Sequence, residues 1–80
     1  MSKTNIHIGR LIRMELESQE RTATWFARKL CCDRSNVYKL FARPTVDTGL
    51  LCRVSVILNC NFFKIYAAEV EKHMSEDTEP

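Results

Sequence analysis

Residues 25–41, WFARKLCCDRSNVYKLF, hold two apolar patterns of helical spacing with a polar break between them. In each pattern the apolar side chains recur at intervals of three and four residues, which places them on one face of a helix. They are Phe26, Ala27 and Leu30 before the break and Val37, Leu40 and Phe41 after it. The break has room for a tight turn and little else. Two such short helices cannot bury their apolar faces alone, so the rest of the chain has to supply the core.

The same spacing extends along most of the chain and predicts five helices. We expect them over residues 6–19, 23–31, 34–42, 46–58 and 62–72. Helix ends are expected at residues that suit capping, namely Thr22, Asp33, Thr45 or Asp47, Asn59 and Asn61. The fourth helix should bury Val46, Leu50, Val54, Ile57 and Leu58. The expected fold class is therefore all-α, a compact five-helix bundle with a central helix-turn-helix.

Eighty residues are enough for one domain. We expect residues 6–72 to fold as that domain, with a disordered N-terminus over 1–5 and an acidic disordered tail over 73–80. No apolar run approaches the roughly 18 residues that span a membrane. The first residues lack the apolar stretch of a signal peptide, so a cytoplasmic location is expected. No part of the chain is left over for a domain that binds a small-molecule effector.

The four cysteines, Cys31, Cys32, Cys52 and Cys60, lie within apolar patterns. A free cysteine in such a setting behaves as a small apolar residue, so we expect reduced, structural thiols. A zinc site is the weaker alternative, because adjacent cysteines lack the spacer of structural zinc sites and the two histidines lie at opposite ends of the chain. A disulfide or redox role is the other alternative. We expect no metal and no cofactor.

The net charge of +2 conceals an asymmetry between the body of the chain and its end. Residues 1–68 carry 11 Lys and Arg against 5 Asp and Glu, whereas residues 69–80 carry one Lys against 5 acidic residues. A basic body is consistent with a polyanionic partner and equally with an ordinary solvated surface. The chain offers no nucleophile–base pair, glycine-rich phosphate loop or paired carboxylates, so an enzyme is not expected.

The segment TWFARKLCCDRSNVYKLF, followed by PTVDTGLLCRVSVILNCNFFKIYA, resembles the phage-repressor-like (XRE-type) helix-turn-helix family. The resemblance covers roughly residues 6–70. It implies the five-helix DNA-binding domain of small bacterial and phage transcriptional regulators, which place the second helix of the pair in the major groove of double-stranded DNA.

The sequence departs from the family at two positions. Cys31 stands where the family usually has a left-handed glycine, a substitution that costs on the order of 1 kcal/mol if the conformation is kept. Either the turn differs or the core tolerates the strain. Ala23 stands where the family often has a glutamine that contacts a phosphate, and Thr22 and Thr24 could replace that contact.

The helix expected over residues 34–42 has a polar outer surface. With Val37, Leu40 and Phe41 inward, 100° per residue places Ser35 and Lys39 opposite them and Arg34, Asn36 and Tyr38 on the flanks. We expect four residues to read bases, Arg34, Ser35, Tyr38 and Lys39. We expect four others to contact the DNA backbone, Thr22, Thr24, Asn36 and Arg43. The alternative for each is a solvated side chain, and Asp33 is expected to cap the helix.

The last two expected helices carry more apolar side chains than the core can bury, which predicts self-association. Phe62, Ile65 and Tyr66 can serve the core, whereas Phe63 and Val70 fall on the other side. We therefore expect a symmetric homodimer, at least on DNA, through residues 46–58 and 62–72 with Phe63 and Val70 near the contact. The alternative is a monomer in which Phe63 packs under Trp25. A competing function for the same fold is an antitoxin-like or adaptor module that binds protein.

Overall fold

The computed structural model describes residues 5–76 of the chain and is all-helical over that range. The helices are α1 (Ile8–Ser18), α2 (Ala23–Leu30), α3 (Arg34–Phe41), α4 (Thr48–Leu58) and α5 (Phe63–Glu76). The expected all-α class and the five helices are confirmed. Residues 1–4 and 77–80, which belong to the ends expected to be disordered, lie outside the described residues.

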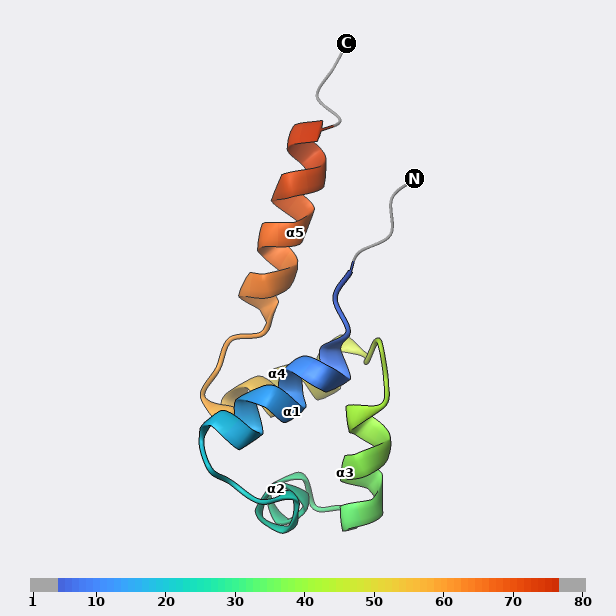
Figure 1. Cartoon of the computed structure of the whole chain (residues 1–80), viewed down its shortest axis with the longest axis vertical. Helices are drawn as coiled ribbons and strands as arrows, with labels where there is room; N and C mark the ends of the chain where they lie inside the picture. The colour runs from blue at the N-terminus through green and yellow to red at the C-terminus, as the bar shows by residue number, and fades with distance from the viewer. Residues whose placement is uncertain (1–4, 77–80) are drawn as a thin grey trace.

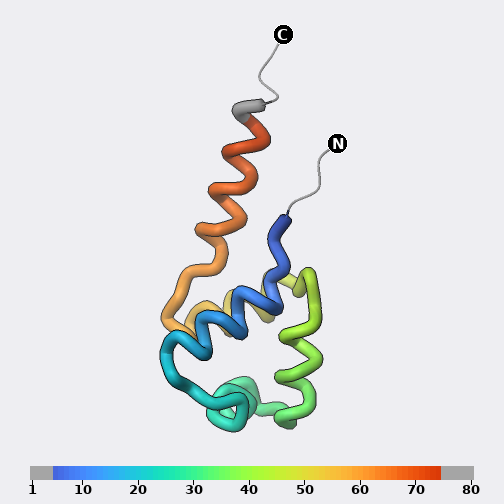
Figure 2. The backbone as a smooth tube through the Cα atoms, in the orientation of Figure 1, coloured from blue at the N-terminus to red at the C-terminus, as the bar shows by residue number. Residues whose placement is uncertain are grey.

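Four helices form the packed body, and α5 projects from it (Figure 1). In the backbone trace α1 lies against α4, with α2 and α3 at the end of the body opposite to α5 (Figure 2). The projection of α5 gives the molecule extents of 51 × 21 × 20 Å. The elements expected to carry function thus lie at one end of the molecule and α5 at the other.

The core joins residues from α1 to α4 and adds Phe62, which directly precedes α5. Its buried members are Ile8, Ile12, Leu16, Phe26, Ala27, Leu30, Val37, Leu40, Phe41, Leu51, Val54, Leu58 and Phe62. Of the residues that we expected the fourth helix to bury, Val54 and Leu58 are buried, whereas Val46, Leu50 and Ile57 are only half-buried at the edge of the core. Leu51, which was not expected there, is buried. The sequence pattern is ambiguous here because α4 is apolar around most of its circumference, so the contacts with α1 and α2 decide which side is buried.

α5 differs from expectation in its burial and in its length. Phe62 is buried and Tyr66 half-buried, but Ile65 is 36% exposed, so its expected place in the core is wrong. The reason is that α5 projects away from the body (Figure 1). The helix also continues to Glu76, beyond the expected end at residue 72. A hydrogen bond of 2.9 Å between Glu69 and His73, four residues apart, supports this last part.

The helix caps follow the sequence with one exception. Thr22 Oγ1 accepts from the Trp25 N–H at 3.0 Å, and Asp47 Oδ1 accepts from the Leu50 N–H at 2.7 Å. Asn59 closes α4 in the left-handed conformation, with φ 50°. Asn61 Oδ1 accepts from the Phe63 N–H at 3.0 Å. Asp33 occupies the N-cap position of α3, but its side chain makes no capping hydrogen bond, so the expected cap is not formed.

Gly9 allows α1 to begin directly against the end of α3. Its backbone N–H donates to the Arg43 carbonyl at 2.9 Å, and the Ile8 N–H donates to the Pro44 carbonyl at 3.2 Å. A Cβ on Gly9 would lie 2.5 Å from the Leu40 carbonyl oxygen and 2.7 Å from that of Arg43. Real Cβ atoms do not approach backbone oxygens so closely, so only glycine fits. This contact sets where α3 ends relative to α1.

Candidate functional site

The connection between α2 and α3 keeps the left-handed conformation that a glycine normally supplies. Cys31 has φ 58° and ψ 47°, and its N–H donates to the Arg28 carbonyl at 3.1 Å. The Cys32 N–H donates to the Ala27 carbonyl at 3.0 Å, so the two turn amides close the end of α2. Of the two alternatives for the departure at Cys31, the turn therefore retains its conformation and the fold tolerates the strain.

α3 is buried along one side and exposed along the other. Val37 is fully buried, and Leu40 and Phe41 are 5% and 8% exposed. All eight residues expected to contact DNA are exposed: Thr22, Thr24, Arg34, Ser35, Asn36, Tyr38, Lys39 and Arg43. The inward-facing residues are those expected, so the outer surface of α3 carries the polar side chains that the helical spacing assigned to it.

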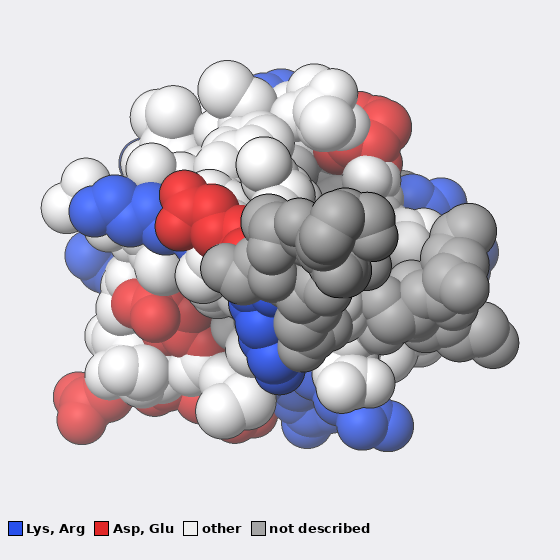
Figure 3. All heavy atoms as spheres, turned by 90° about the horizontal axis from the view of Figure 1, so that it is seen from above, with Lys and Arg blue, Asp and Glu red and all other residues white. Residues whose placement is uncertain are grey.

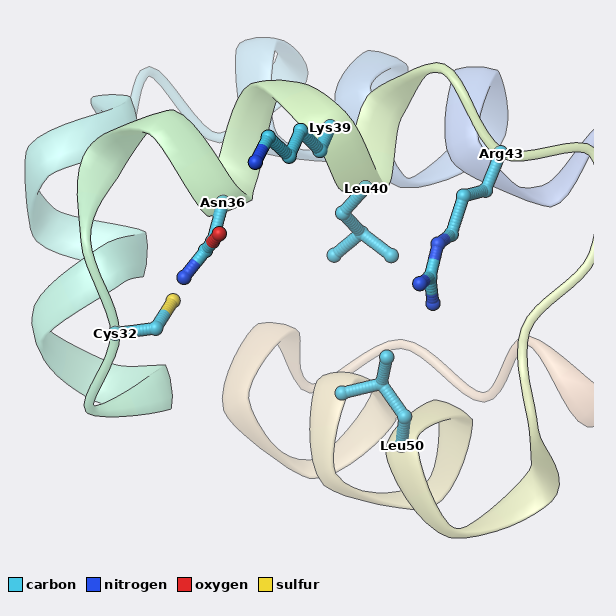
Figure 4. A pocket seen from close by; sticks show the side chains of 6 residues that line it. All are labelled: Cys32, Asn36, Lys39, Leu40, Arg43 and Leu50. Carbon is cyan, nitrogen blue, oxygen red and sulfur yellow. The ribbon is translucent and has the colours of Figure 1, made fainter.

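The side of α3 that faces α4 forms a shallow groove of about 210 Å³. Asn36, Lys39, Leu40 and Arg43 come from α3 and the residues after it, and Leu50 faces Leu40 from α4 (Figure 4). Cys32 closes the end nearest α2. Asn36 and Arg43, both expected to contact the DNA backbone, therefore share one flank with Lys39, which was expected to read bases.

The other flank of α3 faces α1 and the start of α2. The Tyr38 and Phe41 rings meet edge to face, with centroids 5.9 Å apart. Arg13 and Arg21 line the same hollow of about 130 Å³ as Tyr38. Tyr38 thus lies on the opposite flank from Lys39, and the four residues expected to read bases do not form a single cluster.

Arg13 and Arg21 were not among the residues expected at the site. The Arg13 guanidinium lies 5.7 Å from the centre of the Phe41 ring, and its Nε is 3.1 Å from Glu17 Oε2. The Arg21 guanidinium lies 4.5 Å from the centre of the Trp25 ring, a cation–π contact that holds it beside α2. No local pattern shows that these residues border α3, because their position follows from how α1 packs on α3.

The segment of the chain that forms α2 and α3 is rich in positive charge. From residue 21 to residue 43 the chain carries six Lys and Arg residues against one acidic residue, Asp33. At the end where α5 projects, acidic and basic side chains are interspersed instead (Figure 3). Glu17 also lies beside α2 and α3, where it pairs with Arg13. An excess of Lys and Arg in one segment favours a polyanionic partner, since clustered cations raise the local concentration of anions.

The oxidation state and the neighbours of the four cysteines bear on their chemistry. All four are free thiols, and no group of three His, Cys, Asp or Glu side chains that could hold a metal occurs among the described residues. Burial, the charge of Glu15 and a hydrogen bond to Glu15 raise the pKa of the Cys60 thiol above its ordinary value of 9.0. Because the thiolate is the reactive form, Cys60 is a poor nucleophile.

Comparisons of the chain with protein-family models, with curated proteins and with solved structures found no match. Within residues 5–76 no helix is both long and apolar enough to cross a membrane. Any functional assignment therefore rests on the chain's own residues and their arrangement.

Proposed function

We propose that the protein is a sequence-specific regulator that binds double-stranded DNA, with α2 and α3 acting as a helix-turn-helix. The observation that carries the proposal is the two-sided character of α3. Its apolar side is fixed in the core, and its other side presents Arg34, Ser35 and Lys39 to solvent. These residues belong to a segment, 21–43, that carries six Lys and Arg against one Asp. An α-helix presented in this way fits the major groove of B-form DNA.

The proposed contacts fall into two kinds, with bases contacted by the first turn of α3 and phosphates contacted by residues on its two flanks. Arg34 and Ser35 stand in the first turn of α3 and would meet base edges first, Arg34 as a bidentate partner of guanine. Arg13 and Arg21 on one flank and Arg43 on the other would meet the phosphates on either side of the groove. Tyr38 lies on the same flank as Arg13 and Arg21, and Lys39 lies on the same flank as Arg43. Both retain the proposed role of base contacts.

Selection of bound duplexes from a random DNA pool tests the proposal. The protein should enrich one short motif, and its binding to that motif should weaken steeply with added salt because cations on the protein displace counterions. Arg34→Ala should cost about 1–3 kcal/mol and relax the preference at a single base pair. A protein that enriches no motif and binds no duplex at low salt contradicts the proposal.

Arg13→Ala and Arg21→Ala should behave differently from Arg34→Ala. Each removes one proposed phosphate contact, so binding should weaken to a similar degree on every sequence. The slope of the logarithm of affinity against the logarithm of salt concentration should fall in magnitude by about one. Lys72→Ala is the matched control, since it removes one exposed cation from α5 at the other end of the molecule. It should leave both affinity and sequence preference unchanged.

A protein-interaction module of the antitoxin or adaptor kind remains the second candidate. The observation that favours it is the exposure of large apolar side chains away from α3, including Val56 at 75% and Val70 at 54%. Exposed apolar patches commonly mark protein contacts. The two functions are separated by the selection experiment, because a protein-binding module without a DNA site enriches no duplex.

A further inference from the structure

Arg21 lies in a connection whose backbone is held on both sides. Its N–H donates to the Leu16 carbonyl at 3.1 Å, directly after Glu20, which adopts the left-handed conformation with φ 59°. One residue later, Thr22 accepts from the Trp25 N–H and caps α2. The end of α1 and the start of α2 therefore both fix the backbone of Arg21. Its side chain is exposed.

The Trp25 ring supports that side chain. The Arg21 guanidinium lies over the ring, 4.5 Å from its centre, whereas Lys29 Nζ lies 5.8 Å from the same centre. The ring is half-buried and packs against the core, so it is itself held in place. Trp attracts cations more strongly than the other aromatic side chains do. Arg21 thus has a rigid support for a side chain that is flexible on its own.

This support leaves the hydrogen-bond donors of Arg21 available. A cation–π contact does not use the guanidinium N–H groups, which form a planar fork of five donors. Within residues 5–76 the Arg21 guanidinium donates no hydrogen bond and forms no ion pair. Arg13 on the same flank differs, since its Nε donates to Glu17 Oε2 at 3.1 Å. Arg21 is therefore the arginine of this flank that can offer its whole fork to a ligand.

The available donors border the hollow beside Tyr38. Arg13, Arg21 and Tyr38 line this hollow, but Trp25 does not. The donor fork of an arginine matches two oxygens of a phosphate group at once. A phosphate seated here would contact Arg21 directly, and Trp25 would act on it only through Arg21.

We propose that Trp25 is a positioning residue for DNA binding, which holds Arg21 ready for one backbone phosphate on the flank of α3 that faces α1. The inference rests on the proposed function and adds to it a role for a residue that contacts no DNA. A long side chain that is ordered before binding loses less rotamer freedom on the DNA, so binding costs less entropy. The two arginines of this flank are also unequal, because a phosphate competes with Glu17 for Arg13.

A double-mutant cycle on DNA affinity tests this role. Trp25→Leu keeps an apolar side chain at the edge of the core and removes the ring. It should weaken binding roughly 2- to 10-fold, the factor that corresponds to ordering one long side chain on binding. In the Arg21→Ala background the same change should have almost no effect, because no guanidinium is left to position. Trp25→Phe keeps a ring and should bind more tightly than Trp25→Leu.

Arg43→Ala supplies the matched control for the cycle. Arg43 is also a proposed phosphate contact, but it lines the groove on the opposite flank of α3. Trp25→Leu should therefore weaken binding by the same factor whether residue 43 is Arg or Ala. Circular dichroism and thermal denaturation check that each variant is folded. If Trp25→Leu weakens binding equally with and without the Arg21 side chain, the ring does not act through Arg21 and the proposal is overturned.

A measurement without DNA separates this inference from the proposed function. The Cδ protons of Arg21 should resonate at lower chemical shift in the parent than in Trp25→Leu, because an aromatic ring shields protons over its face. Those of Arg43 should not move. Unchanged Arg21 signals contradict the contact. If the contact is present but the parent binds no duplex, the proposed function and this role both fall. If the parent binds its duplex and the cycle is additive, only the role of Trp25 falls.

Discussion

The backbone nitrogen of Gly9 lies 2.9 Å from the carbonyl oxygen of Arg43, so the first turn of α1 rests directly on the end of α3. Gly9 has no positive φ angle, and its role is therefore to leave space and not to permit an unusual backbone conformation. The same contact ties α1 to the segment that leads from α3 to α4. It holds the proposed DNA-contacting helix in a fixed position on the body.

Gly9→Ala should destabilise the protein by about 1–3 kcal/mol, because the added methyl group meets backbone carbonyls that cannot move as a side chain can. Chemical denaturation measures the loss. Gly49→Ala is the control, since a Cβ there would meet only Asp47 Oδ1, at 3.3 Å. Its effect should stay within about 1 kcal/mol in either direction. Equal losses for the two variants would show that the close approach at Gly9 carries no special constraint.

The two aspartates at helix starts should differ in their contribution to stability. Asp47→Ala removes a hydrogen bond of 2.7 Å to the Leu50 N–H and should cost about 1 kcal/mol. Asp33→Ala removes a side chain that makes no capping hydrogen bond, so thermal denaturation should show a smaller loss. It also removes the only carboxylate between residues 21 and 43 and should tighten binding to DNA. A larger loss of stability for Asp33→Ala than for Asp47→Ala contradicts the cap assignment.

Cys31→Gly should stabilise the protein by up to about 1 kcal/mol, because glycine adopts the left-handed conformation of the turn without the strain of a Cβ. Cys31→Ala keeps the Cβ and should leave the stability close to that of the parent. Urea denaturation of the three proteins separates the backbone effect from the loss of the thiol. If the glycine and alanine variants are equally stable, the turn is not strained.

The Cys60 thiol should be alkylated more slowly than Cys31 and Cys52, which are exposed. The raised pKa of Cys60 lowers its thiolate fraction at any pH near neutrality. Timed alkylation at pH about 8 with peptide mapping measures the order. Glu15→Gln removes the neighbouring charge and should speed the reaction at Cys60, whereas Glu17→Gln should not. Faster reaction at Cys60 than at Cys31 in the parent contradicts this account.

The same pKa shift has a consequence for stability. A folded-state pKa above the unfolded value of 9.0 means that folding favours the neutral thiol. This contribution to the free energy of unfolding is fully present below about pH 9 and is lost as the pH rises through the folded pKa.

The regular elements were predictable because their signals are local. The spacing of apolar residues located all five helices, and Thr22, Asp47 and Asn59 marked ends that the structure confirms. The exposed side of α3 followed from the same spacing, since Val37, Leu40 and Phe41 leave only one side free.

The remaining features depend on how the helices pack. The position of Arg13 and Arg21 beside Tyr38 requires α1 to cross near α3, and the exposure of Ile65 requires α5 to leave the body. α4 is apolar on most sides, so the packing of α1 and α2 against it decides that Leu51 is buried and Leu50 only half-buried. None of these outcomes is encoded within one helix.

Titration of the isotope-labelled protein with its selected duplex, followed by amide chemical shifts, tests the central claim most directly. The account predicts that the largest changes occur at Arg34, Ser35 and Lys39, with smaller changes at Thr22 and Arg21 beside α2. The amides of α5 from Glu69 to Met74 should not change. Changes confined to α4 and α5, with α3 unaffected at saturation, would contradict the proposal that α3 is the helix presented to DNA.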